Sequence, residues 1–345
     1  MLSLFFHQWE RRLADVSKDR IVRPFEWGLD WLPAPANGHD RDAAARIREY
    51  VAGVLADPRA WYTPPPTDAY EVGARAADGT ALVRFPSART TPHPENNTVV
   101  ARYFPASSRR QPRRAVLVLP QWNSDDGGHV GLCRLLARFG MSALRLSLPY
   151  HDTRMPPELT RADYIVSSNV VRTLEVCRQA VLDARRAIGW LASQGYERIG
   201  ILGTSLGSCL SMLTACYEPL VRAQALNHIS PYFGDVVWRG LSTRHVRRGL
   251  DGHVTLDDLR AFWLPISPQA HLEALASRDL ATLLVYARYD LTFPVDLSRN
   301  LVSEFQSRGI PNQVSVLPCG HYSTGVAPFK FMDGAVLTRF LDRAL

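Results

Sequence analysis

Residues 198–207 read Arg-Ile-Gly-Ile-Leu-Gly-Thr-Ser-Leu-Gly, an apolar run that leads into a G-x-S-x-G motif. The run predicts a buried strand, and residues 208–215 predict a helix directly after it. A strand, a tight G-x-S-x-G turn and a helix together present a nucleophilic serine at the end of a sheet strand. Small flanking residues permit the strained turn, and the helix directs its positive end at the serine. We therefore expect Ser205 to be a nucleophile; the alternative is an ordinary Gly/Ser turn.

The partners that a nucleophilic serine requires occur later in the chain. The serine needs a base to take its proton, and the base needs an acid that orients it. In this architecture the chain order is serine, acid, histidine, with each group on a loop after a strand. Asp290 follows the expected strand 282–286, and His321 follows the expected strand 313–317. We expect Asp290 to be the orienting acid and His321 the base, with Asp235 as the weaker alternative acid.

Two backbone N–H groups are needed to stabilise the negative oxygen of an acyl-transfer intermediate. One is expected from Leu206, because it directly follows the candidate nucleophile. The other is expected from the loop after the buried strand 115–119. By position, Trp122 is the first choice for this second donor and Gln121 the next.

A further loop, residues 149–157, is expected at the same edge of the sheet. Ligands of open α/β sheets bind at the carboxyl ends of the strands. Tyr150, His151 and Arg154 are therefore candidates for lining a substrate pocket. Arg154 could bind an anionic substrate group; the equal alternative is that it pairs with Asp152 or ties down the loop.

The order of the apolar segments predicts an α/β fold. Strands that alternate with helices indicate a mostly parallel central sheet with helices on both faces, here after an antiparallel start. The expected strands are residues 70–75, 81–85, 98–104, 115–119, 142–146, 198–202, 223–227, 282–286 and 313–317, and the expected helices are residues 129–139, 170–194, 208–215, 256–263 and 327–345.

Residues 1–66, here called the N-terminal arm, stand apart from this alternation. Helix-like spacing occurs over 2–18 and 40–55, and a connector rich in Trp and Pro lies between them at 24–33. Aromatic residues in such an arm more often pack it against the main body than bind a ligand. We expect packing.

Residues 231–276, here called the insertion, interrupt the alternation within the main body, residues 67–345. An insertion between two late strands is the place for a cap over the active site. A structural excursion without gating is the other interpretation. Within the insertion, Thr255 is the expected N-cap of a short helix.

Composition narrows the class of protein. The chain has 345 residues, 46% of them hydrophobic and 21% charged, with a formal net charge of +7. Its basic residues are scattered and no nucleic-acid-binding motif accompanies them, so no nucleic-acid partner is expected. The 5 cysteines lack C-x-x-C spacing and are expected to be reduced core residues. No signal peptide or transmembrane segment is recognised, which favours a cytoplasmic protein.

Ser205, Asp290 and His321, in this order on alternating strands and helices, resemble the α/β-hydrolase superfamily over about residues 70–345. The layout is similar to the serine-esterase branch, which includes acetyl xylan esterase-like and dienelactone hydrolase-like enzymes. Dienelactone hydrolases usually have a cysteine where this chain has Ser205.

The resemblance implies hydrolysis of a small-molecule carboxylic ester through an acyl-enzyme, without a metal or an organic cofactor. An acyltransferase, or an amidase or peptidase, that uses the same three residues is the first alternative. A non-catalytic binding protein on a hydrolase scaffold is the second. The resemblance implies neither an oligomeric state nor an acyl specificity.

Overall fold

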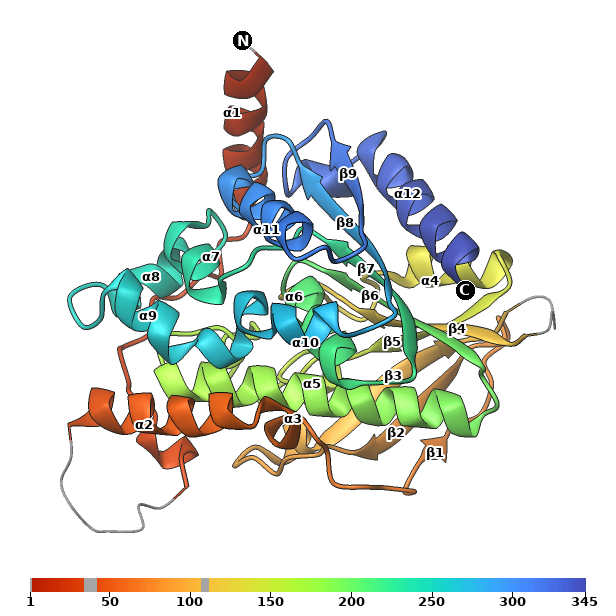
Figure 1. Cartoon of the computed structure of the whole chain (residues 1–345), viewed down its shortest axis with the longest axis horizontal. Helices are drawn as coiled ribbons and strands as arrows, with labels where there is room; N and C mark the ends of the chain where they lie inside the picture. Colours follow the sequence, from red (N-terminus) through yellow and green to blue (C-terminus); the bar gives the residue numbers. More distant parts are fainter. Residues whose placement is uncertain (1, 34–41, 107–111) are drawn as a thin grey trace.

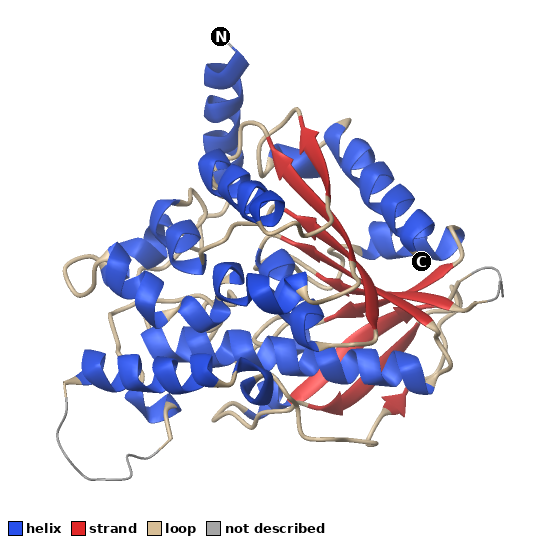
Figure 2. Ribbon diagram, in the orientation of Figure 1, coloured by secondary structure: helices blue, strands red, loops and turns tan. Residues whose placement is uncertain are grey.

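The computed structural model describes residues 2–33, 42–106 and 112–345. Within these residues nine strands form one sheet in the order β1-β2-β3-β5-β4-β6-β7-β8-β9 (Figures 1 and 2). The strands are β1 (Glu71–Val72), β2 (Ala81–Pro86), β3 (Thr98–Phe104), β4 (Arg114–Leu119), β5 (Met141–Leu146), β6 (Arg198–Thr204), β7 (Val221–Asn227), β8 (Ala281–Ala287) and β9 (Gln313–Leu317).

The sheet begins antiparallel and becomes parallel. Pairs β1–β2, β2–β3 and β3–β5 are antiparallel, and every pair from β5 to β9 is parallel. Strand β4 lies in the parallel part. Its Ala115 and Leu117 pack into one hydrophobic core, and its Val116 and Val118 pack into a second core on the opposite face. Because both faces are buried, the strand is apolar throughout residues 115–119.

Helices cover both faces of the sheet, as Figure 2 shows. On one face α5 (Val170–Ser193) and α6 (Leu206–Tyr217) contact the central strands. On the other face α4 (Val130–Arg138) and α12 (Phe329–Ala344) lie together. The remaining α-helices are α1 (Leu2–Ala14), α2 (Ala43–Ala56), α3 (Pro58–Trp61), α7 (Phe233–Arg239), α8 (Arg244–Leu250), α9 (Leu256–Phe262), α10 (Leu272–Ala276) and α11 (Val295–Ser307).

This architecture confirms the predicted fold class, a mostly parallel sheet with an antiparallel start and helices on both faces. Several boundaries differ. The first strand has 2 residues instead of the expected six, and the first helix ends at Ala14 instead of residue 18. Residues 40 and 41, the expected start of the second helix, lie outside the described residues. No helix in the described residues has the length and apolar character that a membrane span requires.

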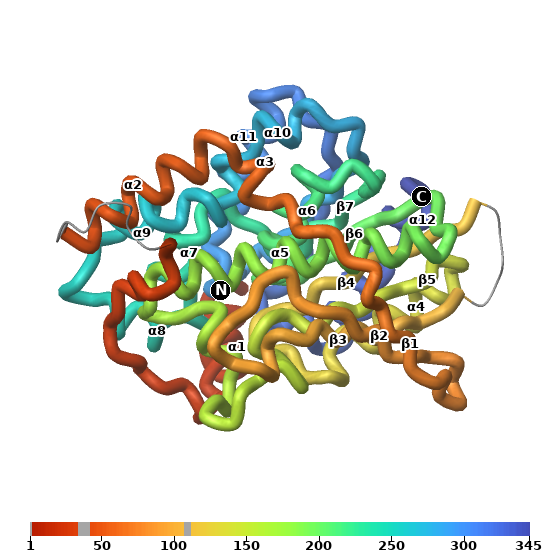
Figure 3. The backbone as a smooth tube through the Cα atoms, turned by 90° about the horizontal axis from the view of Figure 1, so that it is seen from below, coloured from red at the N-terminus to blue at the C-terminus, as the bar shows by residue number. Residues whose placement is uncertain are grey.

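The N-terminal arm contacts the main body through α1, through the connector and through α2. Helix α1 projects from the body (red in Figure 1), and its Phe6 ring stacks on Tyr289 with centroids 4.5 Å apart. Helix α2 lies beside α9 (Figure 3), where the Arg48 guanidinium donates to Asp258 at 2.7 Å. The connector's Trp27 also packs against the core, as expected for the arm's aromatic residues.

The insertion contains more helix than its sequence indicated. Helices α7 to α10 all lie within it, whereas one short helix was expected. That helix, α9, begins with a capping box in which Thr255 and Asp258 bond each other's backbone N–H, as its sequence predicted for Thr255. That the insertion acts as a cap over the active site stays a prediction.

Candidate functional site

Ser205 occupies a sharp turn between strand β6 and helix α6. Its backbone has φ 57° and ψ −118°, a conformation that costs a residue with a side chain about 1–3 kcal/mol. Two hydrogen bonds stabilise the turn: the Ser205 N–H donates to the Asn227 carbonyl at 2.8 Å, and the Ser208 hydroxyl donates to the Ser205 carbonyl at 2.7 Å. The surrounding structure therefore maintains a strained serine at the carboxyl end of the sheet.

The two glycines of the motif are required by space. A Cβ on Gly203 would lie 2.1 Å from the carbonyl oxygen of Gly207. A Cβ on Gly207 would lie 2.2 Å from the carbonyl oxygen of Leu119, at the end of β4. Both distances are far below any van der Waals contact, and backbone atoms cannot easily move away. The motif's small residues are thus explained by close approach of α6 to β6 and β4.

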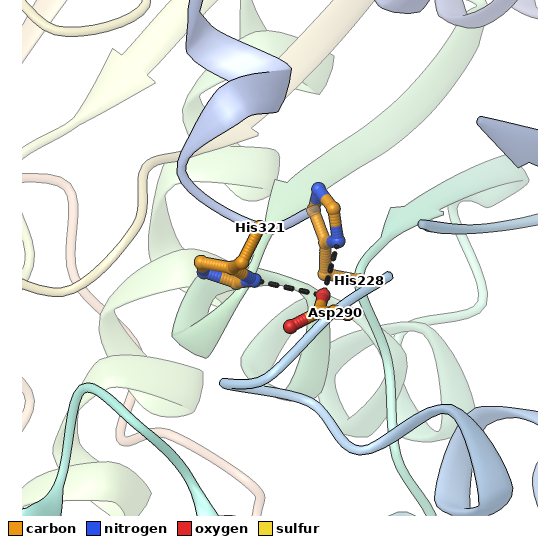
Figure 4. A group of neighbouring side chains, drawn as sticks. All are labelled: His228, Asp290 and His321. Carbon is orange, nitrogen blue, oxygen red and sulfur yellow. Dashed lines mark hydrogen bonds and ion pairs between the residues drawn. The ribbon is translucent and has the colours of Figure 1, made fainter. Parts of the chain in front are cut away.

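Asp290 and His321 lie on neighbouring loops at the same edge of the sheet, after β8 and β9. The backbone N–H groups of Thr292 and Phe293 donate to Asp290 Oδ1 at 2.8 and 2.7 Å. The second oxygen, Oδ2, accepts from His321 Nδ1 at 3.0 Å (Figure 4). The carboxylate is therefore anchored on one side and orients the imidazole on the other.

A second histidine, His228, reaches the same oxygen of Asp290, as Figure 4 also shows. Its Nδ1 lies 2.9 Å from Asp290 Oδ2, and its side chain is almost fully buried. We did not predict this residue from the sequence. The available signal was its position directly after strand β7, which places it at the carboxyl edge of the sheet.

The atoms of His228, Asp290 and His321 lie close enough to resemble a metal site, within 4.8 Å of one another. Hydrogen bonding already accounts for this grouping. A carboxylate oxygen only accepts, so each imidazole donates its Nδ1–H to Asp290, and a protonated nitrogen has no lone pair for a metal. The grouping is better described as one acid between two imidazoles.

Charge and burial act in opposite directions on this network. Burial alone would raise the pKa of Asp290, but the positive charge of His321 and the hydrogen bonds from both imidazoles outweigh it and hold the pKa below its usual value. For His321, burial would lower the pKa, but the Asp290 carboxylate outweighs it and raises the pKa above its usual value. Asp290 thus stays ionised and favours the protonated form of His321.

Ser205, His228 and His321 line one cavity with a volume of about 940 Å³, here called the large cavity. The Ser205 side chain is not hydrogen-bonded to any residue in the described ranges, and the residue is 7% exposed. The hydroxyl and the imidazole therefore share an open volume that could admit a substrate between them or beside them. The structure joins Asp290 and His321 by a hydrogen bond and places Ser205 and His321 on one cavity.

The residues expected to supply the oxyanion donors are Leu206, which follows Ser205 in the chain, and Trp122 or Gln121, which line the large cavity with Ser205. None of the hydrogen bonds among the described residues uses the backbone N–H of Leu206, Trp122 or Gln121. The next N–H in that loop, from Asn123, is already engaged by His151 Nε2 at 3.0 Å. Leu206 with Trp122 or Gln121 therefore stays the candidate pair.

Tyr150, His151 and Arg154, which we expected to line a substrate pocket, are buried at 0%, 1% and 0% exposure, and none lines the large cavity. Arg154 pairs with Asp183 at 2.8 Å and ties down its loop; Asp152, its expected partner, pairs with Arg145 instead. Burial decides this outcome, because a ligand in the large cavity cannot reach a guanidinium that is fully enclosed.

Asp235, the weaker alternative acid, is placed elsewhere. Its fully buried carboxylate accepts two hydrogen bonds from Arg260, at 2.8 and 2.7 Å. No hydrogen bond in the described residues joins Asp235 to His321. Asp290 is therefore the acid that geometry favours.

Comparisons with solved structures identify the fold. An acetyl xylan esterase from Paenibacillus sp. R4 superposes with a TM-score of 0.62 at 14% identity, over 92% of this chain and 98% of that one. Acetyl xylan esterase 1 from Thermoanaerobacterium sp. JW/SL YS485 gives 0.59 at 13% identity, over 96% of this chain and 98% of that one. These proteins share the α/β-hydrolase fold, and so does this chain.

An acylaminoacyl peptidase from Pyrococcus horikoshii also matches, with a TM-score of 0.59 at 14% identity over 80% of this chain. The chain spans only 42% of that peptidase's length. No sequence model of a protein family matches the chain, and no curated protein sequence matches it significantly. The likeness is one of fold, so the reaction must be argued from the site.

Proposed function

We propose that the chain is a serine hydrolase that cleaves carboxylic esters, with Ser205 as nucleophile, His321 as base and Asp290 as orienting acid. The observation that carries the proposal is the 3.0 Å contact between His321 Nδ1 and Asp290 Oδ2, beside a serine held in a strained turn on the same cavity. A histidine oriented by a buried acid next to a strained serine is the arrangement that acyl transfer requires.

The reaction begins when His321 Nε2 takes the Ser205 hydroxyl proton as the serine oxygen attacks the ester carbonyl. Asp290 keeps the Nδ1 proton directed at itself, so that Nε2 is free to act, and it stabilises the imidazolium that forms. The N–H of Leu206 and that of Trp122 or Gln121 bind the carbonyl oxygen as it becomes negative.

The intermediate then collapses. The bond from the carbonyl carbon to the alcohol oxygen breaks, and His321 gives its proton to that oxygen. A water molecule, deprotonated by the same imidazole, attacks the acyl-enzyme. The bond from the carbonyl carbon to the serine oxygen breaks, and His321 returns the proton to that oxygen, which releases the carboxylic acid and restores Ser205. The atoms of ester and water are thus recovered in an acid and an alcohol, without any other reactant.

The test is Ser205→Ala, assayed with p-nitrophenyl acetate and p-nitrophenyl butyrate. We expect kcat to fall by about 10⁴-fold or more, the scale seen when the nucleophile of a serine hydrolase is removed. Ser211→Ala is the matched control, because this buried serine lies on the same helix and its hydroxyl has no partner among the described residues. Unchanged turnover by Ser205→Ala would refute the proposal.

A fluorophosphonate probe gives a second readout that does not depend on the choice of ester. It should label the wild-type chain and Ser211→Ala, and it should fail to label Ser205→Ala. Equal labelling of all three would place the reactive group elsewhere and revive the non-catalytic interpretation of this site.

A further inference from the structure

Ser205 stands between two cavities of different size. The large cavity, about 940 Å³, includes His321 in its lining and excludes Leu206. A second cavity of about 50 Å³, here called the side pocket, includes Leu206 and excludes His321. Ser205, Trp122 and Ser242 line both cavities. An ester bound at Ser205 can therefore extend one part into each cavity.

The proposed reaction assigns the two parts of the ester to the two cavities. The departing alcohol oxygen must take its proton from His321, so the alcohol part leaves on the side of the large cavity. The carbonyl oxygen must face the N–H of Leu206. The acyl chain takes the remaining direction at the carbonyl carbon, away from His321, where the side pocket lies. This assignment rests on the proposed function.

The side pocket is small and apolar. Its volume of about 50 Å³ corresponds to about three to five water-sized groups, since one such group needs about 10–15 Å³. Helix α7 of the insertion contributes part of the lining of the side pocket. The apolar lining includes Val166, Leu206, Cys209, Phe233, Val237 and Phe293. A short acyl chain fits this space, and a long one does not.

The large cavity has a basic lining. Its one carboxylate among the described lining residues is Asp333, and burial raises the pKa of this acid to about 6. Arg134 pairs with Asp78, and Arg161 pairs with both Asp19 and Asp163. Arg20, Arg138 and Lys330 have no acidic partner in the described residues. The basic lining residues are Arg20, Arg134, Arg138, Arg161 and Lys330.

Arg20 and Arg161 bring this charge close to the reacting atoms. Arg20 donates to the Tyr322 hydroxyl at 2.9 Å, next in sequence to His321, and its buried Nε–H has no partner. Arg161 is 7% exposed and lies over the Trp122 ring, 5.4 Å from its centroid.

Together with burial, the guanidinium groups of Arg161 and Arg20 both lower the pKa of His245. His245 stacks on Trp122 with centroids 5.7 Å apart. Burial, followed by the charges of Arg161 and Arg20, lowers the pKa of this histidine to about 4. Both arginines therefore act on the imidazole that stacks on Trp122, while the Asp19 carboxylate opposes them.

We infer that the substrate is an ester of a short carboxylic acid with an alcohol that carries a negative charge. The acyl chain occupies the side pocket, and the anionic group of the alcohol, a carboxylate or a phosphate, pairs with Arg20 and Arg161 in the large cavity. Attack by Ser205 joins its oxygen to the short acyl group, and the anionic alcohol leaves with the proton from His321. Water then releases the short acid.

The first experiment compares aryl acetates that differ in the charge of the alcohol part. The esters are 4-acetoxybenzoate and 4-acetoxyphenyl phosphate, which are anionic, and 4-acetoxybenzamide, which is neutral. We expect kcat/KM, corrected for uncatalysed hydrolysis, to favour an anionic ester by about tenfold or more, mainly through KM, and the preference to weaken with salt. The two anionic esters distinguish a carboxylate from a phosphate site.

Arg20→Gln should reduce the preference for the anionic ester by about tenfold, because it removes an unpaired charge from the cavity. Arg244→Gln is the control: this exposed arginine pairs with Asp15 and does not line the large cavity, so the preference should be unchanged. Equal kcat/KM for charged and neutral esters in the wild type, or an unchanged preference in Arg20→Gln, would overturn the inference.

The second experiment varies the acyl chain of p-nitrophenyl esters from acetate through butyrate to octanoate. The wild type should lose about tenfold or more in kcat/KM between butyrate and octanoate. Val237→Ala, which enlarges the side pocket, should move the optimum to longer chains. Val246→Ala, a buried valine outside the pocket, should not. Equal turnover of butyrate and octanoate by the wild type would overturn the assignment of the side pocket.

These outcomes separate the inference from the proposed function. Cleavage that depends on Ser205 but shows no preference for charge or chain length would leave the proposed function standing and refute only the substrate class. Absence of any cleavage that depends on Ser205 would refute both.

Discussion

The N-terminal arm and the insertion both lie outside the strand–helix alternation, and both contact Tyr322, yet they contribute different chemistry. From the arm, Arg20 donates to the Tyr322 hydroxyl at 2.9 Å. From the insertion, the Ser242 hydroxyl lies 2.7 Å from the same oxygen. The loop that carries His321 is therefore held between two segments that lie far apart in the sequence.

The arm acts mainly through charge and hydrogen bonds. Glu10, on helix α1, is 0% exposed, and its two carboxylate oxygens accept the backbone N–H groups of Tyr322 and Ser323 at 2.8 and 2.9 Å. A Cβ on Gly320 would lie 2.3 Å from the Glu10 carboxyl carbon, so only glycine permits this approach. The arm thereby positions the loop that begins at His321.

The insertion acts mainly through packing. Its helix α7 supplies Phe233, Val236 and Val237 to the side pocket beside Ser205. Between these residues lies Asp235, which anchors α7 to α9 through Arg260. Substitutions in the arm should therefore change the pH at which His321 titrates. Substitutions in the insertion should change which acyl chains the side pocket accepts.

The largest expected effect on stability comes from the insertion. Arg260→Ala leaves the fully buried Asp235 carboxylate without its partner, and we expect the free energy of unfolding to fall by about 2–4 kcal/mol. Urea denaturation measures this loss. Selectivity between butyrate and octanoate esters should also weaken, because α7 loosens, while the pH profile should keep its position.

The control for this variant is Arg247→Ala, which breaks an exposed pair with Asp251 and should cost no more than about 0.5 kcal/mol. A shift in the pH profile of Arg260→Ala without a change in chain-length selectivity would contradict the division between the two segments.

The next largest effect comes from the arm. In Glu10→Gln an amide NH₂ faces one of the two backbone N–H groups, and two donors cannot bond each other. The loop at His321 should therefore shift. We expect kcat/KM to fall about 10- to 100-fold, which corresponds to about 1.4–2.8 kcal/mol. Glu10 also contributes to raising the pKa of His321, after Asp290. Since the base must be neutral, losing this negative charge should move the acidic limb of the pH–rate profile to lower pH.

Asp15→Asn provides the matched control for Glu10→Gln, because Asp15 follows the same helix but forms an exposed pair with Arg244. Its pH profile should coincide with that of the wild type. If Glu10→Gln lowered the rate while the acidic limb stayed in place or moved to higher pH, the electrostatic part of the arm's role would be wrong.

The smallest effect is expected where the two segments touch each other. Arg48 of the arm and Asp258 of the insertion form an ion pair of 2.7 Å that solvent reaches, with side-chain exposures of 53% and 29%. Arg48→Gln should cost at most about 1 kcal/mol and leave both the pH profile and the chain-length selectivity unchanged. A large change in either would show that the segments work as one unit.

Several features of the site followed from short stretches of sequence. Ser205 could be expected because the elbow is local: two glycines and a strand-to-helix change lie within ten residues. The positions of Asp290 and His321 after strands also follow from apolar runs. By contrast, Tyr150, His151 and Arg154 satisfied the same rule of position and are nevertheless buried. Position after a strand indicates the edge of the sheet and does not indicate which side chains face its cavity.

Other features depend on residues that are distant in the chain. His228 meets Asp290 because β7 and β8 are neighbours in the sheet, and the order of strands is not written in any one of them. Glu10 reaches the N–H of Tyr322, 312 residues away, and no local pattern distinguishes it from an ordinary acid on a helix surface. Neither contact can therefore be derived from a short stretch of the sequence.

The sequence alone was sufficient for the α/β architecture, the elbow at Ser205 and the order of its candidate partners, because hydrophobic periodicity and glycine sterics act over a few neighbouring residues. The second imidazole on Asp290, the carboxylate beneath the His321 loop and the unequal cavities on the two sides of Ser205 arise only when distant segments pack. Charge, burial and enclosed volume depend on distances through space, and those distances exist only in the folded chain.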